Sequence, residues 1–225
     1  YKYNELPSPN LESIIHYKTN NLFIPSVING KEYPFGSGQK QSDKIQHNYP
    51  INHNLSYEAY PLYDLHKHID MDIMERARLH WNNIGLDRRV QIFEDIADQI
   101  ENNTYGYKDE LLVHTMIGQG KSLYEAEIDS VCELVDFLRF NNYYAMEIQS
   151  RANSLISDEH ELNFSEINGL NGFVAAITPF NFTAIGADLV SGPLLMGNPV
   201  IWKPSESALL SNYTFYKILL ENNVP

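Results

Sequence analysis

The sequence predicts an α/β fold in which a helical layer leads into the start of a doubly wound, parallel, Rossmann-like sheet. Up to about residue 150, apolar residues recur at helical spacing through four successive segments. From about residue 169 the pattern changes to two short apolar runs, 172–178 and 199–203, each followed by a helical pattern. Strands that alternate with helices are typical of a parallel sheet covered on both faces.

Composition excludes several classes of protein. The chain has 225 residues and a formal net charge of −13, so neither nucleic acid nor an anionic membrane is expected as a partner. Its hydrophobic content of 43% is enough for a buried core. One cysteine rules out an intrachain disulfide, and the eight histidines show no zinc-binding spacing, so no metal site is expected. No apolar run approaches the roughly 20 residues of a membrane helix.

The first 60 residues are irregular, and we expect the chain to be a piece of a longer one, since it begins at Tyr1 and stops just after a helical pattern. Asn29-Gly30 lies between two short extended runs and predicts a β-hairpin. The segment 36–40, Gly-Ser-Gly-Gln-Lys, has neither the strand nor the helix that a phosphate-binding loop requires, which favours an ordinary surface loop.

Four helices are predicted next, at about 65–84, 87–100, 107–117 and 121–150. In the second helix Asp87 is expected to be the N-cap, with Arg88, Arg89 and Glu94 facing solvent. The last is expected to be one long helix with an apolar stripe and an acidic outer face.

Residues 151–168 break the helical period. Their apolar residues alternate loosely with polar ones, which predicts one or two exposed strands of the kind that pair with another chain or domain. Beyond them, the two predicted sheet strands end at 178–181 and 203–206. Ligands of doubly wound sheets bind beyond the carboxyl ends of the strands.

At these two strand ends the sequence resembles the aldehyde dehydrogenase superfamily. Ile-Thr-Pro-Phe-Asn-Phe at 177–182 matches its Pro-aromatic-Asn motif, and Met-Gly-Asn-Pro-Val-Ile-Trp-Lys-Pro-Ser-Glu at 196–206 matches its Gly-Asn-x-hydrophobic-Lys-Pro-Ser motif. The sequence of residues 172–186, together with segments 116–121, 126–129 and 137–141, is similar to sequences of one branch of the superfamily, the glutamate γ-semialdehyde (1-pyrroline-5-carboxylate) dehydrogenases. The resemblance runs from roughly Tyr33 to the last residue and is weakest before Tyr60.

The resemblance implies a catalytic role for Asn181. Members of this family attack the aldehyde with a cysteine thiolate, transfer hydride to NAD and hydrolyse the thioester with a glutamate as base. A neutral amide donor stabilises the oxyanion of the tetrahedral intermediate, and Asn181 matches that position. The alternative is an asparagine that merely caps the turn between strand and helix.

The resemblance also implies an NAD site. Lys203 and Glu206 would bind the adenosine ribose, where a carboxylate favours NAD over NADP. The alternative is a solvated Lys-Glu pair at a helix entrance. The remaining cofactor contacts would line the nicotinamide side and the adenosine side; they are Thr178, Pro179, Phe180, Pro204 and Ser205. The sequence has no Gly-x-Gly-x-x-Gly fingerprint, on which cofactor binding in this family does not depend.

Glu133 and Phe182 are the candidate substrate contacts. By resemblance Glu133 belongs to the substrate-entry helix, where it would meet the amino end of the semialdehyde, although a solvated helical glutamate is the default reading. Phe182 would form a wall for the aliphatic part of the substrate. Cys132 is the only thiol, yet it falls inside the long helix without a basic neighbour to lower its pKa. The nucleophile and the base are expected beyond Pro225.

Three functional hypotheses follow. The first is NAD-dependent oxidation of L-glutamate γ-semialdehyde in proline catabolism by the full-length protein, with this chain inactive alone. The second is a non-catalytic relative that serves as a binding or assembly module, and the third an enzyme for another aldehyde. Residues 1–150 would form the arm and helices of the NAD-binding domain, 151–168 the oligomerisation strands and 169–225 the start of the sheet. The resemblance implies a homo-oligomer, mitochondrial in a eukaryote and otherwise cytoplasmic.

Overall fold

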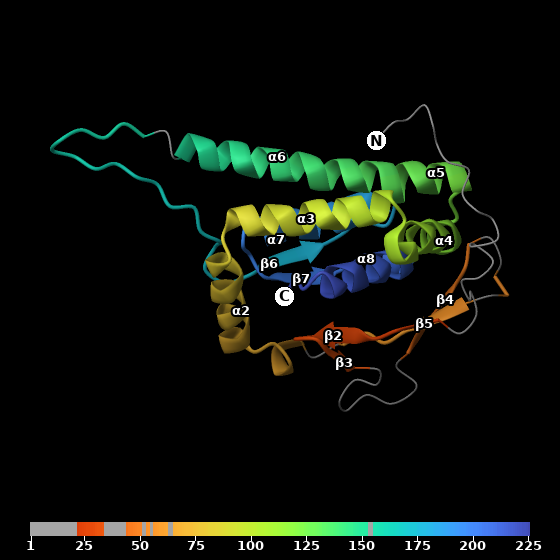
Figure 1. Ribbon diagram of the computed structural model, residues 1–225. Helices are drawn as coiled ribbons and strands as arrows, with labels where there is room; N and C mark the ends of the chain where they lie inside the picture. Colours follow the sequence, from red (N-terminus) through yellow and green to blue (C-terminus); the bar gives the residue numbers. More distant parts are fainter. Residues whose placement is uncertain (1–21, 34–43, 51–52, 55, 63–64, 153–154) are drawn as a thin grey trace.

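The computed structural model describes residues 22–33, 44–50, 53–54, 56–62, 65–152 and 155–225. In Figure 1, α6 runs along one side of the molecule, α3 and α7 lie beneath it, and β6, β7 and α8 follow before the N-terminal strands. The helices are α2 (Met71–Asn83), α3 (Leu86–Glu101), α4 (Tyr107–Gln119), α5 (Leu123–Glu127), α6 (Leu134–Ala152), α7 (Thr183–Leu195) and α8 (Leu209–Glu221). The strands are β1 (Phe23–Ile24), β2 (Ser26–Ile28), β3 (Lys31–Tyr33), β4 (Ile45–Asn48), β5 (Ser56–Ala59), β6 (Val174–Ile177) and β7 (Val200–Lys203).

The N-terminal region contains more strand than the sequence indicated. The predicted hairpin is confirmed, because β2 and β3 pair antiparallel around Asn29 and Gly30, both of which have positive φ. A second, unpredicted sheet has the order β1-β5-β4, and its buried Tyr57 packs on the same cluster as Leu210 of α8. The segment 36–40 lies outside the described residues.

The second predicted helix differs in two details. Gly85, not Asp87, is the N-cap of α3, and Asp87 lies in its first turn. Arg89 was predicted to face solvent, but it is 4% exposed. Its guanidinium donates to the carbonyl oxygens of Leu195 at 2.7 Å and Trp81 at 3.0 Å. It thereby supplies hydrogen-bond donors to the last carbonyl groups of α7 and α2, which have no partner within their own helices. A charged side chain can point inward when such acceptors are available, which local periodicity does not reveal.

The predicted helix of 121–150 is continuous but not uniform. Between α5 and α6 the chain forms a π-helical segment, Ile128–Glu133. π-Helical turns are rare and change which side chains face the core. Here the segment buries Asp129 and also Cys132, whose thiol is 0% exposed, as predicted for a structural cysteine.

β6 and β7 pair in parallel, with Val174 opposite Val200 and Ile177 opposite Lys203. The prediction that both strands are covered on both faces is wrong for the described residues. In β6 only Ala176 is buried, and Ile177 is 75% exposed. Successive side chains of a strand point to opposite faces, and the described residues leave uncovered the face of β6 that carries Ala175 and Ile177.

The strand prediction for 151–168 is also wrong in the described residues. Residues 155–168 form no strand and protrude beyond α6 as an extended loop (Figure 1). A turn closes it, in which Asp158 Oδ1 accepts from the amides of His160 and Glu161, both at 2.8 Å. The loop has no strand to pair with in the described chain, so its alternating pattern does not become a ladder.

α7 is the central helix of the molecule. It contacts α3, α6, α8 and both strands of the parallel pair, and eight of its 13 residues are buried. Gly186 permits the close approach of α8, since a Cβ there would lie 2.6 Å from Asn212 Oδ1. None of the described helices is long and apolar enough to cross a membrane.

His114 of α4 gives the fold a testable pH dependence. Its Nδ1 lies 2.6 Å from Thr214 Oγ1 and 3.7 Å from a carboxylate oxygen of Glu110, which is itself paired with Lys217. Burial, and secondarily the charge of Lys217, lower the pKa of His114 from 6.5 to about 3. Between these two values the unfolded chain binds a proton that the folded chain does not, so stability is lost as the pH falls below about 6.5.

We therefore expect the free energy of unfolding of the wild type to fall by about 2 kcal/mol more than that of His114→Gln between pH 7 and pH 5. Urea unfolding followed by circular dichroism at the two pH values measures this difference. Equal losses in the two proteins would show that His114 is not the group responsible.

Candidate active site at the carboxyl ends of two strands

The candidate site lies where β6 and β7 end together. The register puts Ile177 beside Lys203, and the next amide, that of Thr178, donates to the Lys203 carbonyl at 3.2 Å. The indole Nε1 of Trp202 donates to Thr178 Oγ1 at 3.0 Å and ties the two ends across the pair. The loops that carry Asn181 and Glu206 therefore leave one edge of the sheet, where ligands of doubly wound folds bind.

Asn181 is exposed, and its amide makes no hydrogen bond with the described residues. The N-cap of α7 is Phe182, which has no side-chain hydrogen bond to the helix. Neither observation gives Asn181 the hydrogen bond of a residue that caps the turn. A side-chain amide that is exposed beyond a strand end is free to donate to a ligand.

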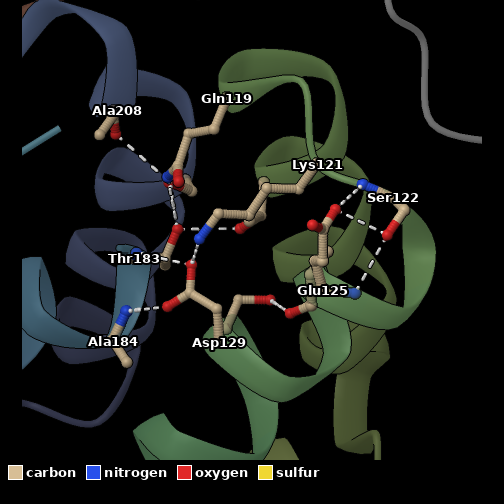
Figure 2. A network of polar contacts seen from close by, with 12 residues as sticks. Gln119, Lys121, Ser122, Glu125, Asp129, Thr183, Ala184 and Ala208 are labelled. Atoms are coloured by element: carbon tan, nitrogen blue, oxygen red, sulfur yellow. Dashed lines mark hydrogen bonds and ion pairs between the residues drawn. The ribbon is translucent and has the colours of Figure 1, made fainter. Parts of the chain in front are cut away.

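The backbone just after Asn181 is held by Asp129 (Figure 2). One oxygen of its carboxylate accepts from the amide of Thr183 at 2.9 Å and the other from the amide of Ala184 at 2.8 Å. Asp129 is 1% exposed, and Lys121 Nζ lies 2.5 Å from its Oδ2. A buried carboxylate with two backbone donors and an ammonium partner is well compensated.

The hydroxyl of Thr183 lies in a cluster of polar side chains (Figure 2). The hydrogen bonds of this cluster link α4, α7 and α8. Thr183 Oγ1 accepts from Gln119 Nε2 at 2.7 Å, donates to Ser211 Oγ at 2.8 Å and shares a hydrogen bond of 2.9 Å with Thr115 Oγ1. Thr115, Thr183 and Ser211 are at most 1% exposed. The first residue of α7 is thus fixed through both its backbone and its side chain.

The two candidate substrate residues lie around the same group of charges. The ammonium of Lys121 is 4.3 Å from the ring centroid of Phe182, a cation–π contact. Glu133 ends the π-helical segment, half-buried. Burial and then the charge of Asp129 raise the pKa of Glu133, and the charge of Lys121 opposes that rise. Lys121 is therefore electrostatically coupled to Glu133 and in contact with Phe182.

The candidate cofactor residues differ in how they are held. Lys203 and Glu206 are exposed, and neither side chain has a hydrogen bond to the described residues. The backbone of Glu206 is fixed, because its carbonyl accepts from the buried Tyr57 hydroxyl at 3.0 Å. An exposed ammonium and carboxylate on an anchored turn form a donor–acceptor pair that fits a diol such as ribose.

The other predicted cofactor residues line the same edge. Thr178 is buried, and its hydroxyl accepts a hydrogen bond from Trp202, so its side chain stabilises the strand ends. Pro179, Pro204 and Ser205 are partly buried, while Phe180 is 64% exposed. One surface hollow lies against β6 and α7 and includes Ile177, the residue before Thr178. The predicted cofactor residues thus lie together along the ends of the two strands.

Sequence reasoning missed the polar residues that anchor the site, above all Asp129, Lys121 and Thr183. They lie in segments whose periodicity showed only helices. No signal in the sequence indicated them, because Asn181 and Thr183, on either side of the N-cap Phe182, are both ordinary N-cap residues. The motif residue Asn198 is likewise structural, because it accepts from Leu170 N at 2.8 Å and donates to the Pro193 carbonyl at 3.0 Å.

Comparison with known proteins gives the family of this chain. Residues 39–225 match the model of the aldehyde dehydrogenase family. The chain is 39% identical over 219 residues to the mitochondrial delta-1-pyrroline-5-carboxylate dehydrogenase of Dictyostelium discoideum, covering 95% of this chain and 37% of that protein. The corresponding human protein is 40% identical over 202 residues, covering 90% and 34%. The chain thus spans about a third of the length of these curated relatives.

The fold is similar to solved structures as well. The delta-pyrroline-5-carboxylate dehydrogenase of Mycobacterium tuberculosis, solved with NAD bound, superposes with a TM-score of 0.85 at 33% identity, over 97% of this chain and 40% of that one. The predicted α/β fold, with a helical layer before a parallel sheet, is therefore confirmed. From the family match over residues 39–225, this chain belongs to the aldehyde dehydrogenase family.

Proposed function

We propose that this chain is the N-terminal part of an enzyme that oxidises L-glutamate γ-semialdehyde, formed from 1-pyrroline-5-carboxylate, to L-glutamate with NAD. The observation that carries the proposal is the shared edge of β6 and β7, where Asn181, Lys203 and Glu206 are exposed and their side chains make no hydrogen bond to the described residues. The choice of aldehyde is supported by relatives of that name, which are about 40% identical over most of this chain.

In this proposal Asn181 stabilises the oxyanion that forms when a thiolate adds to the aldehyde. Its amide N–H groups are neutral donors, and its backbone is anchored two residues further on, at Thr183. A preorganised donor of this kind lowers the barrier without reorganising during the reaction. Cys132 is sealed inside the helical layer and cannot be the nucleophile, so the nucleophile and the base belong to the rest of the enzyme.

Lys203 and Glu206 would hold the adenosine ribose of NAD. The ammonium donates to a ribose hydroxyl, the carboxylate accepts from one, and the same carboxylate repels the 2′-phosphate of NADP. When bound, NAD supplies the hydride acceptor of the oxidation. Thr178, Pro179 and Phe180 would line the nicotinamide side, and Pro204 and Ser205 the adenosine side.

Glu133 and Phe182 would contact the substrate. The carboxylate of Glu133 suits the substrate ammonium group, and the Phe182 ring, 36% exposed, suits its methylene groups. A non-catalytic binding module, the alternative from another class, is an outcome of the first experiment below. A different aldehyde as substrate would appear there as a higher kcat/KM for that aldehyde.

We also propose that the enzyme is a homo-oligomer and that loop 155–168 is part of the contact. The loop exposes large apolar side chains, Ile156 at 88%, Leu162 at 80% and Phe164 at 76%. Exposed apolar groups that lie close together favour association with another chain. The mitochondrial names of the eukaryotic relatives support a location in the mitochondrial matrix if the source is a eukaryote, and in the cytoplasm otherwise.

Replacement of the proposed oxyanion donor tests the function. In the full-length enzyme, Asn181→Ala should lower kcat for the semialdehyde by roughly 10²- to 10³-fold, because one preorganised donor is lost. Formation of NADH measures the rate, and Asn83→Ala, which removes another exposed asparagine at the end of α2, is the matched control. Absence of turnover in the wild type would favour the binding module, and a normal kcat in Asn181→Ala would remove Asn181 from catalysis.

The cofactor assignment predicts a change in binding and in selectivity. Lys203→Ala should raise the KM for NAD by about tenfold, since a charge-assisted hydrogen bond is worth on the order of 1.5–3 kcal/mol. Glu206→Ala should raise kcat/KM for NADP relative to NAD, because the repulsion of the 2′-phosphate is removed. Steady-state kinetics with both cofactors measures these changes, with the exposed Lys31→Ala as control. Unchanged cofactor constants would support the solvated-pair alternative.

The oligomer proposal predicts more than one copy per particle for the full-length protein by size-exclusion chromatography with light scattering. Phe164→Asp should shift the distribution toward smaller species, because a charge replaces an apolar contact. A wild-type protein that is monomeric at micromolar concentration would contradict the proposal.

A further inference from the structure

The starting observation is that α7 cannot cap its own N-terminus. Phe182, its N-cap, is extended, with φ −137° and ψ 126°, and offers no side-chain acceptor. The first amides of the helix are buried, because Thr183 and Ala184 are both 0% exposed. Buried amides without acceptors are costly, so this end of the helix requires an acceptor from another segment.

Asp129 provides that acceptor from 54 residues earlier in the chain. Its two oxygens take one amide each, at 2.9 and 2.8 Å, which fixes the first turn of α7 against the π-helical segment. The negative charge also complements the positive end of the helix dipole. The arrangement determines where the chain enters α7, at Thr183. Asn181 lies two residues before Thr183.

Lys121 connects this anchor to the loop itself. Its ammonium lies 2.5 Å from Asp129 Oδ2 and 4.3 Å from the centre of the Phe182 ring (Figure 2 shows the ion pair). Phe182 is the residue between Asn181 and the anchored Thr183. Lys121 therefore holds both the carboxylate that fixes the helix and the side chain adjacent to Asn181.

The side chain of Asn181 has no partner of its own in the described chain, so its direction depends on the backbone around it. An oxyanion donor must lie within about 0.5 Å of its productive position to be effective. We propose that Asp129 and Lys121 are positioning residues: the ion pair fixes the loop 179–183 and thereby aims the Asn181 amide at the reacting carbonyl oxygen. The inference rests on the proposed function for its catalytic consequence, whereas the fixing of the loop is independent of it.

Two pairs of variants test this inference in the full-length enzyme. Asp129→Asn keeps the size of the side chain but replaces one of the two acceptor oxygens by a donor that faces an amide. Lys121→Met keeps the length of the chain without its charge, and Lys121→Arg restores the charge. The matched control is Asp188→Asn, which changes a half-buried carboxylate on α7 itself, bonded to Asn141 Nδ2 at 2.6 Å and more than one helical turn beyond the first residue of the helix.

The first readout is hydrogen exchange of the peptide that spans residues 178–186, and the second is the division of the kinetic effect between kcat and KM. Asp129→Asn and Lys121→Met should exchange at least tenfold faster in this peptide and lose at least tenfold in kcat for the aldehyde. The loss in kcat should exceed any rise in the KM for NAD, because Lys203 and Glu206 lie on the other loop, and Lys121→Arg should recover most of kcat. Asp188→Asn should leave both the exchange of the first turn and kcat close to the wild type.

The outcomes separate the inference from the proposed function. Loop exchange unchanged in Asp129→Asn overturns the inference, and so does a kcat within twofold of the wild type in the folded variants. An equal loss of kcat in Asp188→Asn would mean that the loss of a carboxylate near α7 has this effect whether or not it contacts the loop. That result would also overturn the inference. If the wild type oxidises no aldehyde, the proposed function fails, and the exchange of the peptide alone decides whether the pair fixes the loop.

Discussion

The structure depends on a single requirement, that the buried N-terminus of α7 must find hydrogen-bond acceptors. α7 packs against three helices and two strands, so water does not reach its first amides. The acceptor is the carboxylate of Asp129, which the π-helical segment turns inward and Lys121 neutralises. Because the first residue of α7 is fixed in this way, the loop before it, and with it Asn181, leaves the sheet at a defined place.

At the two strand ends, buried polar groups have partners and exposed ones do not. Asn198 and Thr178 belong to the two sequence motifs, but both are buried and bonded within the fold. Asn181, Lys203 and Glu206 belong to the same motifs and are exposed, and their side chains make no hydrogen bond to the described residues. A buried polar group without a partner is costly, whereas an exposed one is solvated at little cost and remains available to a ligand. This contrast separates the residues that build the strand ends from those that can act there.

The sequence was sufficient for features that depend on local order. Apolar spacing predicted the helices around the core and both parallel strands, and the two motifs placed Asn181 and Lys203 at the same edge. Features that depend on distant partners were not predictable in this way. Arg89 faces inward because the C-termini of two other helices offer carbonyls there. The alternation in 155–168 forms no strand, because no described strand lies beside it to pair with. The apolar run of β6 likewise did not reveal that Ala175 and Ile177 are exposed.

The position of Glu133 shows why the anchor and the candidate substrate contact are not independent. The charge of Asp129 raises the pKa of Glu133 and the charge of Lys121 lowers it, so the two charges of the ion pair partly offset each other at this carboxyl. If Lys121 were lost, the carboxyl would face the uncompensated charge of Asp129, and its ionised form would become less favourable. The ionised form is the one that can pair with an ammonium group of a substrate. Lys121, which completes the ion pair that fixes the Asn181 loop, therefore also opposes the effect of Asp129 on Glu133 and favours the charged state of Glu133. This couples the geometry of the proposed site to its electrostatics.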